Sequence, residues 1–116
     1  MYRFEREKVK KAILERVGYV AWQIVSEARS HEISIRLRTL IKYAYIAYIL
    51  GEERFSYIRG MSSKVRAPRF LFHKAIYRAV EEELRKRFEV RFETRRGNKR
   101  YAVITVKQPT LAKVIL

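Results

Sequence analysis

The hydrophobic pattern changes period in the second half of the sequence, and this change constrains the fold more than any other feature. Residues 68–87 read as one long helix, since Pro68 suits a first helical turn, where its missing N–H is no loss. Glu81–Glu83 precede Arg85–Arg87 by four residues, the order and spacing that favour ion pairs along a helix. From 88 to 95 apolar and charged residues alternate, which is the two-residue period of a half-buried strand. The sequence predicts a helix that leads directly into a strand.

A second run with strand character follows at residues 100–106 (RYAVITV), rich in β-branched and aromatic residues. Gly97-Asn98 lies between the two runs and is a two-residue hairpin signal. If Arg96 pairs with Lys99, Phe92 faces Val103 and one face of the hairpin is apolar. The tip then carries four basic side chains, Arg95, Arg96, Lys99 and Arg100.

Two helices are predicted earlier in the chain. Positions 4–29 carry apolar residues at three- and four-residue spacings, and 17–25 are apolar almost throughout. Residues 33–50 are predicted as a second helix ended by Gly51, and 43–50 are apolar and aromatic all round. Charged residues interrupt this run well short of the ~20 residues of a membrane span, so a subunit interface is favoured. A plain core helix with partly exposed tyrosines is the alternative. Candidate interface residues are Val20, Trp22, Tyr45 and Tyr48.

Residues 52–67 have the least regular pattern, and one short helix is predicted there, around Phe55–Arg59. From Arg54 through Val80 the chain has no acidic residue. The Lys and Arg residues of this stretch are Arg54, Arg59, Lys64, Arg66, Arg69, Lys74 and Arg78. Charge runs are usually solvated faces, but elsewhere in this chain the bases alternate with Glu. A basic stretch without acids favours a partner that carries phosphate.

Composition narrows the chemistry further. The chain has 27 Lys and Arg against 12 acidic residues, and its formal net charge of +15 exceeds what solubility requires of a small domain. Nucleic acid leads the polyanionic partners, and an anionic membrane surface comes second. Cys and Asp are absent, and the two histidines, His31 and His73, lie in separate segments. No metal site, cofactor or catalytic pair is expected. His73 is interpreted as a hydrogen-bonding, phosphate-contacting or merely exposed side chain.

Length indicates a single domain over residues 1–116. It divides into an N-terminal helix (1–31), a core (32–107) and an apolar tail (108–116) that is expected to be packed. Charged residues fill the N-terminus in place of a signal peptide, so a cytoplasmic location is expected, in the host cell if the protein is viral. Abundant Glu, Lys and Arg with few amides is typical of hyperthermophiles.

The order of these elements resembles that of winged helix DNA-binding proteins, of the type found in hyperthermophilic archaea and their viruses or plasmids. The resemblance covers residues 33–107 and is carried by element order and by the placement of charge. It implies an α+β, mostly helical fold, with a winged helix-like domain, a long N-terminal helix and a C-terminal β-hairpin wing. In that family the helix before the wing lies in the DNA major groove, and the wing contacts the backbone or the minor groove.

The resemblance implies that residues 68–87 form the recognition helix. Its core face would carry Phe72, Ala75, Ile76, Ala79, Val80 and Leu84. The implied DNA contacts of this helix and the preceding loop are Lys64, Arg66, Arg69, His73, Lys74, Tyr77 and Arg78, and those of the wing are Arg95, Arg96, Lys99 and Arg100. Arg69 is the first choice for reading a guanine, whereas Lys64, Arg66 and Lys74 would contact phosphates.

The expected function is double-stranded DNA binding by a homodimeric transcription regulator. It would read the major groove with the helix 68–87 and grip the minor groove or backbone with the tip 95–100. RNA binding and a non-specific chromatin role remain alternatives, because charge alone does not separate them. An enzyme such as a nuclease or recombinase is disfavoured by the lack of Asp and Cys. No membrane association and no small-molecule substrate are expected.

Overall fold

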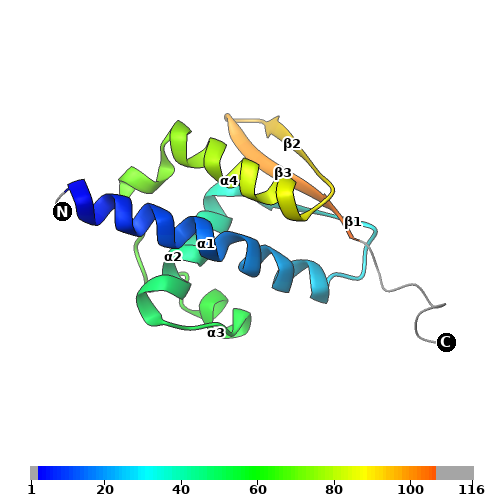
Figure 1. Cartoon of the computed structure of the whole chain (residues 1–116). Coiled ribbons are helices and arrows are strands. Elements are labelled where there is room, and N and C mark those ends of the chain that lie inside the picture. Colours follow the sequence, from blue (N-terminus) through cyan, green and yellow to red (C-terminus); the bar gives the residue numbers. More distant parts are fainter. Residues whose placement is uncertain (1–2, 107–116) are drawn as a thin grey trace.

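The structure, a computed structural model, describes residues 3–106. Its elements are α1 (Arg3–Glu27), β1 (Glu32–Arg36), α2 (Leu37–Leu50), α3 (Phe55–Gly60), the 3-10 helix η1 (Arg69–Phe72), α4 (Lys74–Arg87), β2 (Val90–Arg95) and β3 (Lys99–Thr105). Figure 1 shows α4 and the sheet on one side of α1, and α3 on the other. The predicted α+β, mostly helical class is confirmed, as are the first helix and the short helix at α3. The predicted packing of the tail 108–116 falls outside the described residues.

The strands form one antiparallel sheet in the order β1-β3-β2. Central β3 pairs with both neighbours, so that Ala102 is opposite Ile35 on one side and Phe92 on the other. Ala102 and Ile104 are completely buried in the core that α1, α2 and α4 share with the sheet. The sheet therefore has one face on the helices and one outer face.

The short strand β1 replaces the start of the helix predicted over 33–50. Its residues alternate between exposed Glu32 and Ser34 and more buried Ile33 and Ile35, as a half-buried strand requires. Five residues are too few for this alternation to stand out from a helical pattern, and pairing with the distant β3 decides the conformation. Helix α2 begins only after Arg36, whose backbone is extended.

The β2–β3 hairpin is present as predicted, but its register differs by one residue. Arg95, not Arg96, pairs with Lys99, and the loop between them contains three residues. Gly97 and Asn98 both have positive φ, 76° and 58°, a conformation that Gly and Asn tolerate better than other residues. Because a one-residue slip exchanges the two faces of a strand, Phe92 faces Ala102 and not Val103.

Ion pairs cover the outer face of the sheet. Arg91 reaches from β2 to β1, where its Nη1 donates to Glu32 at 2.8 Å, and Arg95 Nη2 donates to the Ser34 hydroxyl at 2.9 Å. Hydrogen bonding by Arg91 holds the pKa of Glu32 below its ordinary value, and Arg95 with Arg91 does the same to the pKa of Glu93. Val103, which points to this face between β1 and β2, is only 1% exposed.

The helix predicted over 68–87 is two elements with a break at His73. The backbone of His73 is extended, and its Nδ1 accepts a hydrogen bond from the Ala75 N–H at 3.4 Å, so His73 caps α4. Pro68 stands before the separate helix η1. Ile76 is buried as expected of the core face, but Ala75 is exposed, contrary to prediction.

Glu81 joins α4 to the hairpin. Its carboxylate accepts from Arg100 Nη2 on β3 at 3.1 Å and lies 3.6 Å from Arg85 one helical turn away. Glu82 pairs with the same Arg85 at 2.7 Å, but 64% of its side chain is exposed against 11% for Glu81. Arg87 has no ion pair within the described chain and packs over Gly18, where an added Cβ would lie 2.6 Å from Arg87 Cδ. The predicted four-residue pairing thus holds for Glu81 and Arg85.

None of the helices in the described part of the chain combines the length and apolarity that crossing a bilayer requires.

We expect Glu81→Ala to destabilise the protein by about 2 kcal/mol, because it leaves a partly buried guanidinium without its partner. Glu82→Ala, the matched control, removes an exposed pair and should cost less than about 0.5 kcal/mol. Urea unfolding followed by circular dichroism measures both. Equal losses would mean that Glu81 does not hold the hairpin on α4.

Glu52 gives a pH dependence that can be tested. Hydrogen bonds from the Arg54 side chain, followed by those from the backbone N–H groups of Arg54 and Glu53, lower the pKa of Glu52 from 4.5 to about 2. Because the folded pKa is the lower one, the contribution of Glu52 to stability is fully present above the unfolded pKa and is lost as the pH falls through the folded pKa.

The difference in unfolding free energy between the native chain and Glu52→Gln should therefore shrink as the pH falls from 5 to about 2. Unfolding at several pH values tests this, with an NMR titration of the Glu52 carboxyl as a direct check. A difference that stays constant across this range, or an ordinary pKa, would contradict the prediction.

Candidate nucleic-acid interface

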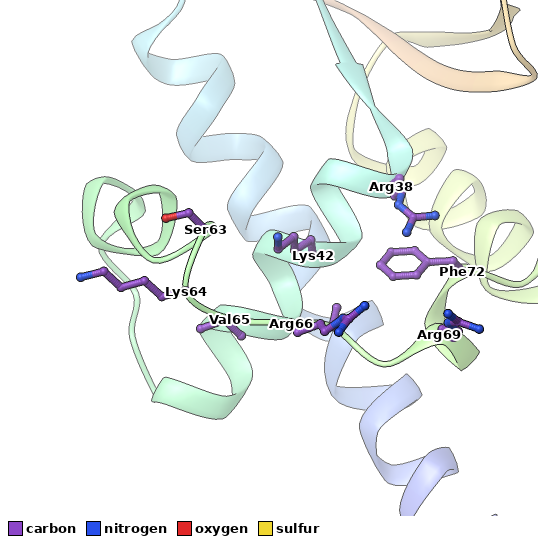
Figure 2. Close-up of a pocket in the computed structure, with 9 residues that line it drawn as sticks. Arg38, Lys42, Ser63, Lys64, Val65, Arg66, Arg69 and Phe72 are labelled. Carbon is purple, nitrogen blue, oxygen red and sulfur yellow. The ribbon is translucent and has the colours of Figure 1, made fainter.

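A concave, basic surface lies between the first half of α2, the loop 61–68 and η1. It encloses about 540 Å³, and we call it the basic cavity. Figure 2 shows its lining, which consists of Arg38, Lys42, Ser63, Lys64, Val65, Arg66, Ala67, Arg69 and Phe72. All of its charged side chains are cationic.

Two of these cations come from α2. Arg38 and Lys42 are four residues apart and so share one face of the helix. The opposite face carries Leu40, Ile41 and Ala44, which are completely buried. Burial of that apolar face forces Arg38 and Lys42 outward, toward the loop.

The loop 61–68 supplies the next two cations. Val65 packs on a small apolar cluster of Ile46, Ala47 and Ile58. Its neighbours on both sides, Lys64 and Arg66, are exposed. The anchored Val65 thus holds the loop against α2 while the basic side chains remain accessible.

The five cations of the basic cavity form no ion pair within residues 3–106. An aromatic ring, and not a carboxylate, positions Arg38. Its guanidinium carbon lies 4.3 Å from the centroid of the Phe72 ring. In Figure 2, Lys42 and Arg66 lie toward the middle of the site, whereas Lys64 points outward at one end and Arg69 lies at the other. Such a row of unpaired cations suits a ligand with several phosphates.

Lys64, Arg66 and Arg69 are the predicted contacts that the fold brings together in the basic cavity. The others lie elsewhere. His73 caps α4, Lys74 and Arg78 are exposed on its first half, and Tyr77 is half-buried against the core.

Arg38 and Lys42 were missed by the sequence interpretation, in which they figured only as interruptions of an apolar run. The available signal was their four-residue spacing opposite a run of apolar residues. That α2 meets the loop 61–68 is a tertiary contact, which no local pattern reveals.

The hairpin tip was predicted to present four free cations, but two of them form ion pairs. Arg95 is paired with Glu93 and lies over the Tyr101 ring at 4.3 Å. Arg100 is paired with Glu81. Of the four, Arg96 and Lys99 are exposed and have no ion pair in the described part of the chain. Arg95 and Arg100 thus hold the hairpin in place.

The four candidate interface residues differ in how exposed their side chains are. Val20 is completely buried in the core of the chain, so its assignment to a subunit interface is wrong. Tyr45 and Tyr48 are half-buried against the same core. Trp22 is 56% exposed and stacks on Tyr19, with ring centroids 6.2 Å apart. Trp22 is the candidate that has apolar surface to offer.

Within residues 3–106, no group of three or more His or Glu side chains is placed so that it could hold a metal ion.

A scan against protein-family models and searches of curated proteins and of solved structures found no match for this chain.

Proposed function

We propose that this chain binds double-stranded DNA through a winged helix-like fold. The observation that carries the proposal is the basic cavity, where cations from α2, the loop 61–68 and η1 lie together without an acidic neighbour. Nucleic-acid backbones are the polyanions that such surfaces bind, because each phosphate that is neutralised releases counterions. The stretch without acids from Arg54 through Val80 includes three of the five cations, and Arg38 and Lys42 extend it in space.

The arrangement of elements supports the winged helix-like interpretation. Helix α4 directly precedes the β2–β3 hairpin, and β1 completes a small sheet with it. In this interpretation α4 is the recognition helix and the hairpin is the wing. The first half of α4 exposes Lys74 and Arg78, whereas in the second half Arg85 pairs with Glu82 and Lys86 with Glu83. The first half is therefore the part suited to the major groove.

The basic residues then divide into three roles. Lys42, Lys64 and Arg66 would contact backbone phosphates and so position the protein. Arg69 and Arg78 lie at or near the start of α4 and would approach base edges, whereas Lys74 would contact a phosphate. Arg96 and Lys99 would reach the backbone or the minor groove from the hairpin tip.

Neutralising two phosphate contacts should weaken DNA binding in a way that salt reveals. For Lys42→Gln with Arg66→Gln, we expect log affinity to fall less steeply with log salt, with the slope reduced by about 2. The matched control, Lys8→Gln with Lys11→Gln, removes two exposed charges of α1 that do not line the basic cavity. Fluorescence anisotropy with a labelled duplex over a range of KCl concentrations measures the slopes.

Equal slopes for the two double variants would exclude the basic cavity from the interface. An RNA duplex of the same sequence serves as competitor. If it displaced the DNA at equimolar concentration, RNA would be the better candidate partner.

We also propose a homodimer that uses the exposed aromatic surface of Tyr19 and Trp22. Exposed aromatic pairs are costly in water and are enriched at protein interfaces. The native chain should have the mass of a dimer in light scattering coupled to gel filtration, and Trp22→Glu should have the mass of a monomer. Tyr57→Ser, which alters an exposed aromatic residue of α3, is the control. A native chain that is still monomeric at about 100 μM, where a dimer with a dissociation constant of about 10 μM would be mostly formed, would contradict the proposal.

A further inference from the structure

The charge of the basic cavity exceeds what a single backbone phosphate would balance. A phosphodiester carries one negative charge, and successive phosphates of one strand are spread along the helix. The cavity instead presents several cations around one concave space of about 540 Å³, without a carboxylate in its lining. A compact group with two or more negative charges matches it better.

The donors in the cavity are also of the kinds that bind such a group. Arg38 offers a planar fork of N–H donors, which suits two oxygens of one phosphate. Its position is set by contact with the Phe72 ring and not by a competing acid, so no ion pair has to break when an anion arrives. Lys42 adds a compact positive charge from the next turn of the same helix. Figure 2 shows it near Arg66, toward the middle of the site.

The rim adds a neutral donor. Ser63 lines the cavity, and its hydroxyl has no hydrogen-bond partner within residues 3–106. A hydroxyl next to cations can donate to a phosphate oxygen without adding charge. The lining thus places a guanidinium, an ammonium group and a hydroxyl around one space.

We infer that the basic cavity binds a multiply charged phosphate group, either the terminal phosphate of a nucleic-acid strand or the phosphate chain of a free nucleotide. Both sources present the same chemistry, namely several anionic oxygens on one or on adjacent phosphorus atoms. The inference rests on the proposed function, because it uses the surface that would also face DNA. It adds a preference for phosphate groups of higher charge than the backbone.

The test compares both sources on the full chain. Duplexes of one sequence, labelled at a 3′ end and carrying either 5′-phosphate or 5′-hydroxyl, are titrated by anisotropy. Inorganic tripolyphosphate and magnesium-free ATP are titrated by calorimetry and used as competitors. Preference for the 5′-phosphate by about tenfold, or displacement of DNA by the free phosphates at matched ionic strength, supports the inference and identifies the source.

Two variants of the cavity and one matched control locate the site. Arg38→Gln with Lys42→Gln should abolish the preference, and the matched pair Lys8→Gln with Lys11→Gln should keep it. Arg66→Gln, a change in an exposed loop residue that should leave the fold intact, should reduce the preference by at least half. Thermal unfolding of each variant verifies the fold.

Indifference to the 5′ group together with no binding of either free phosphate would overturn the inference. The proposed function has a separate readout, the salt-dependent binding of the 5′-hydroxyl duplex. If that duplex binds and no phosphate preference appears, DNA binding stands and the inference falls. If tripolyphosphate binds and no duplex does, the inference about charge stands and DNA binding falls.

Discussion

The central position of β3 is the constraint on which the rest of the structure depends. Because β3 pairs with both β1 and β2, it joins the beginning of the core to its end, residues 32–36 to residues 90–95. This pairing fixes where α2 starts and so which side chains its outer face carries, including Arg38 and Lys42. It also places the hairpin beside α4, where Glu81 binds Arg100. The basic cavity and the hairpin tip are therefore both positioned by one strand.

Six of the acidic residues form ion pairs that hold parts of the scaffold together. Glu32 and Glu93 pair with bases across the outer face of the sheet, Glu81–Glu83 pair along α4, and Glu52 holds the turn before α3. Pairs of this kind stabilise little when exposed, but they keep the bases concerned from acting as free charges. Within residues 3–106, the cations of the basic cavity have no such partners. Their positive charges therefore remain available to an anionic partner.

Aromatic rings, and not carboxylates, contact several of the arginine side chains in this chain. Arg38 lies over Phe72 and Arg16 over Tyr48, and neither has an ion pair within residues 3–106. A ring face attracts a guanidinium without neutralising it, so the side chain is ordered and its charge remains available. At Arg38 this order would favour the proposed binding, because an ordered donor loses less entropy when it meets a phosphate. A chain with many arginines and few acids can in this way be both well packed and strongly basic.

Local patterns were sufficient to predict α1, α3, the β2–β3 hairpin and the stretch without acids, because each depends on residues close together in the sequence. They also singled out Lys64, Arg66 and Arg69, which line the basic cavity. Tertiary structure decided the rest. Residues 32–36 form a strand only because β3 lies beside them, the hairpin register follows from which face meets the core, and His73 ends one helix and caps the next. The contact of α2 with the loop 61–68 added Arg38 and Lys42 to the site. Sequence alone determined the net charge of the chain, and only the fold determined which cations stay unpaired and where they meet, since pairing between distant segments leaves no mark on local periodicity.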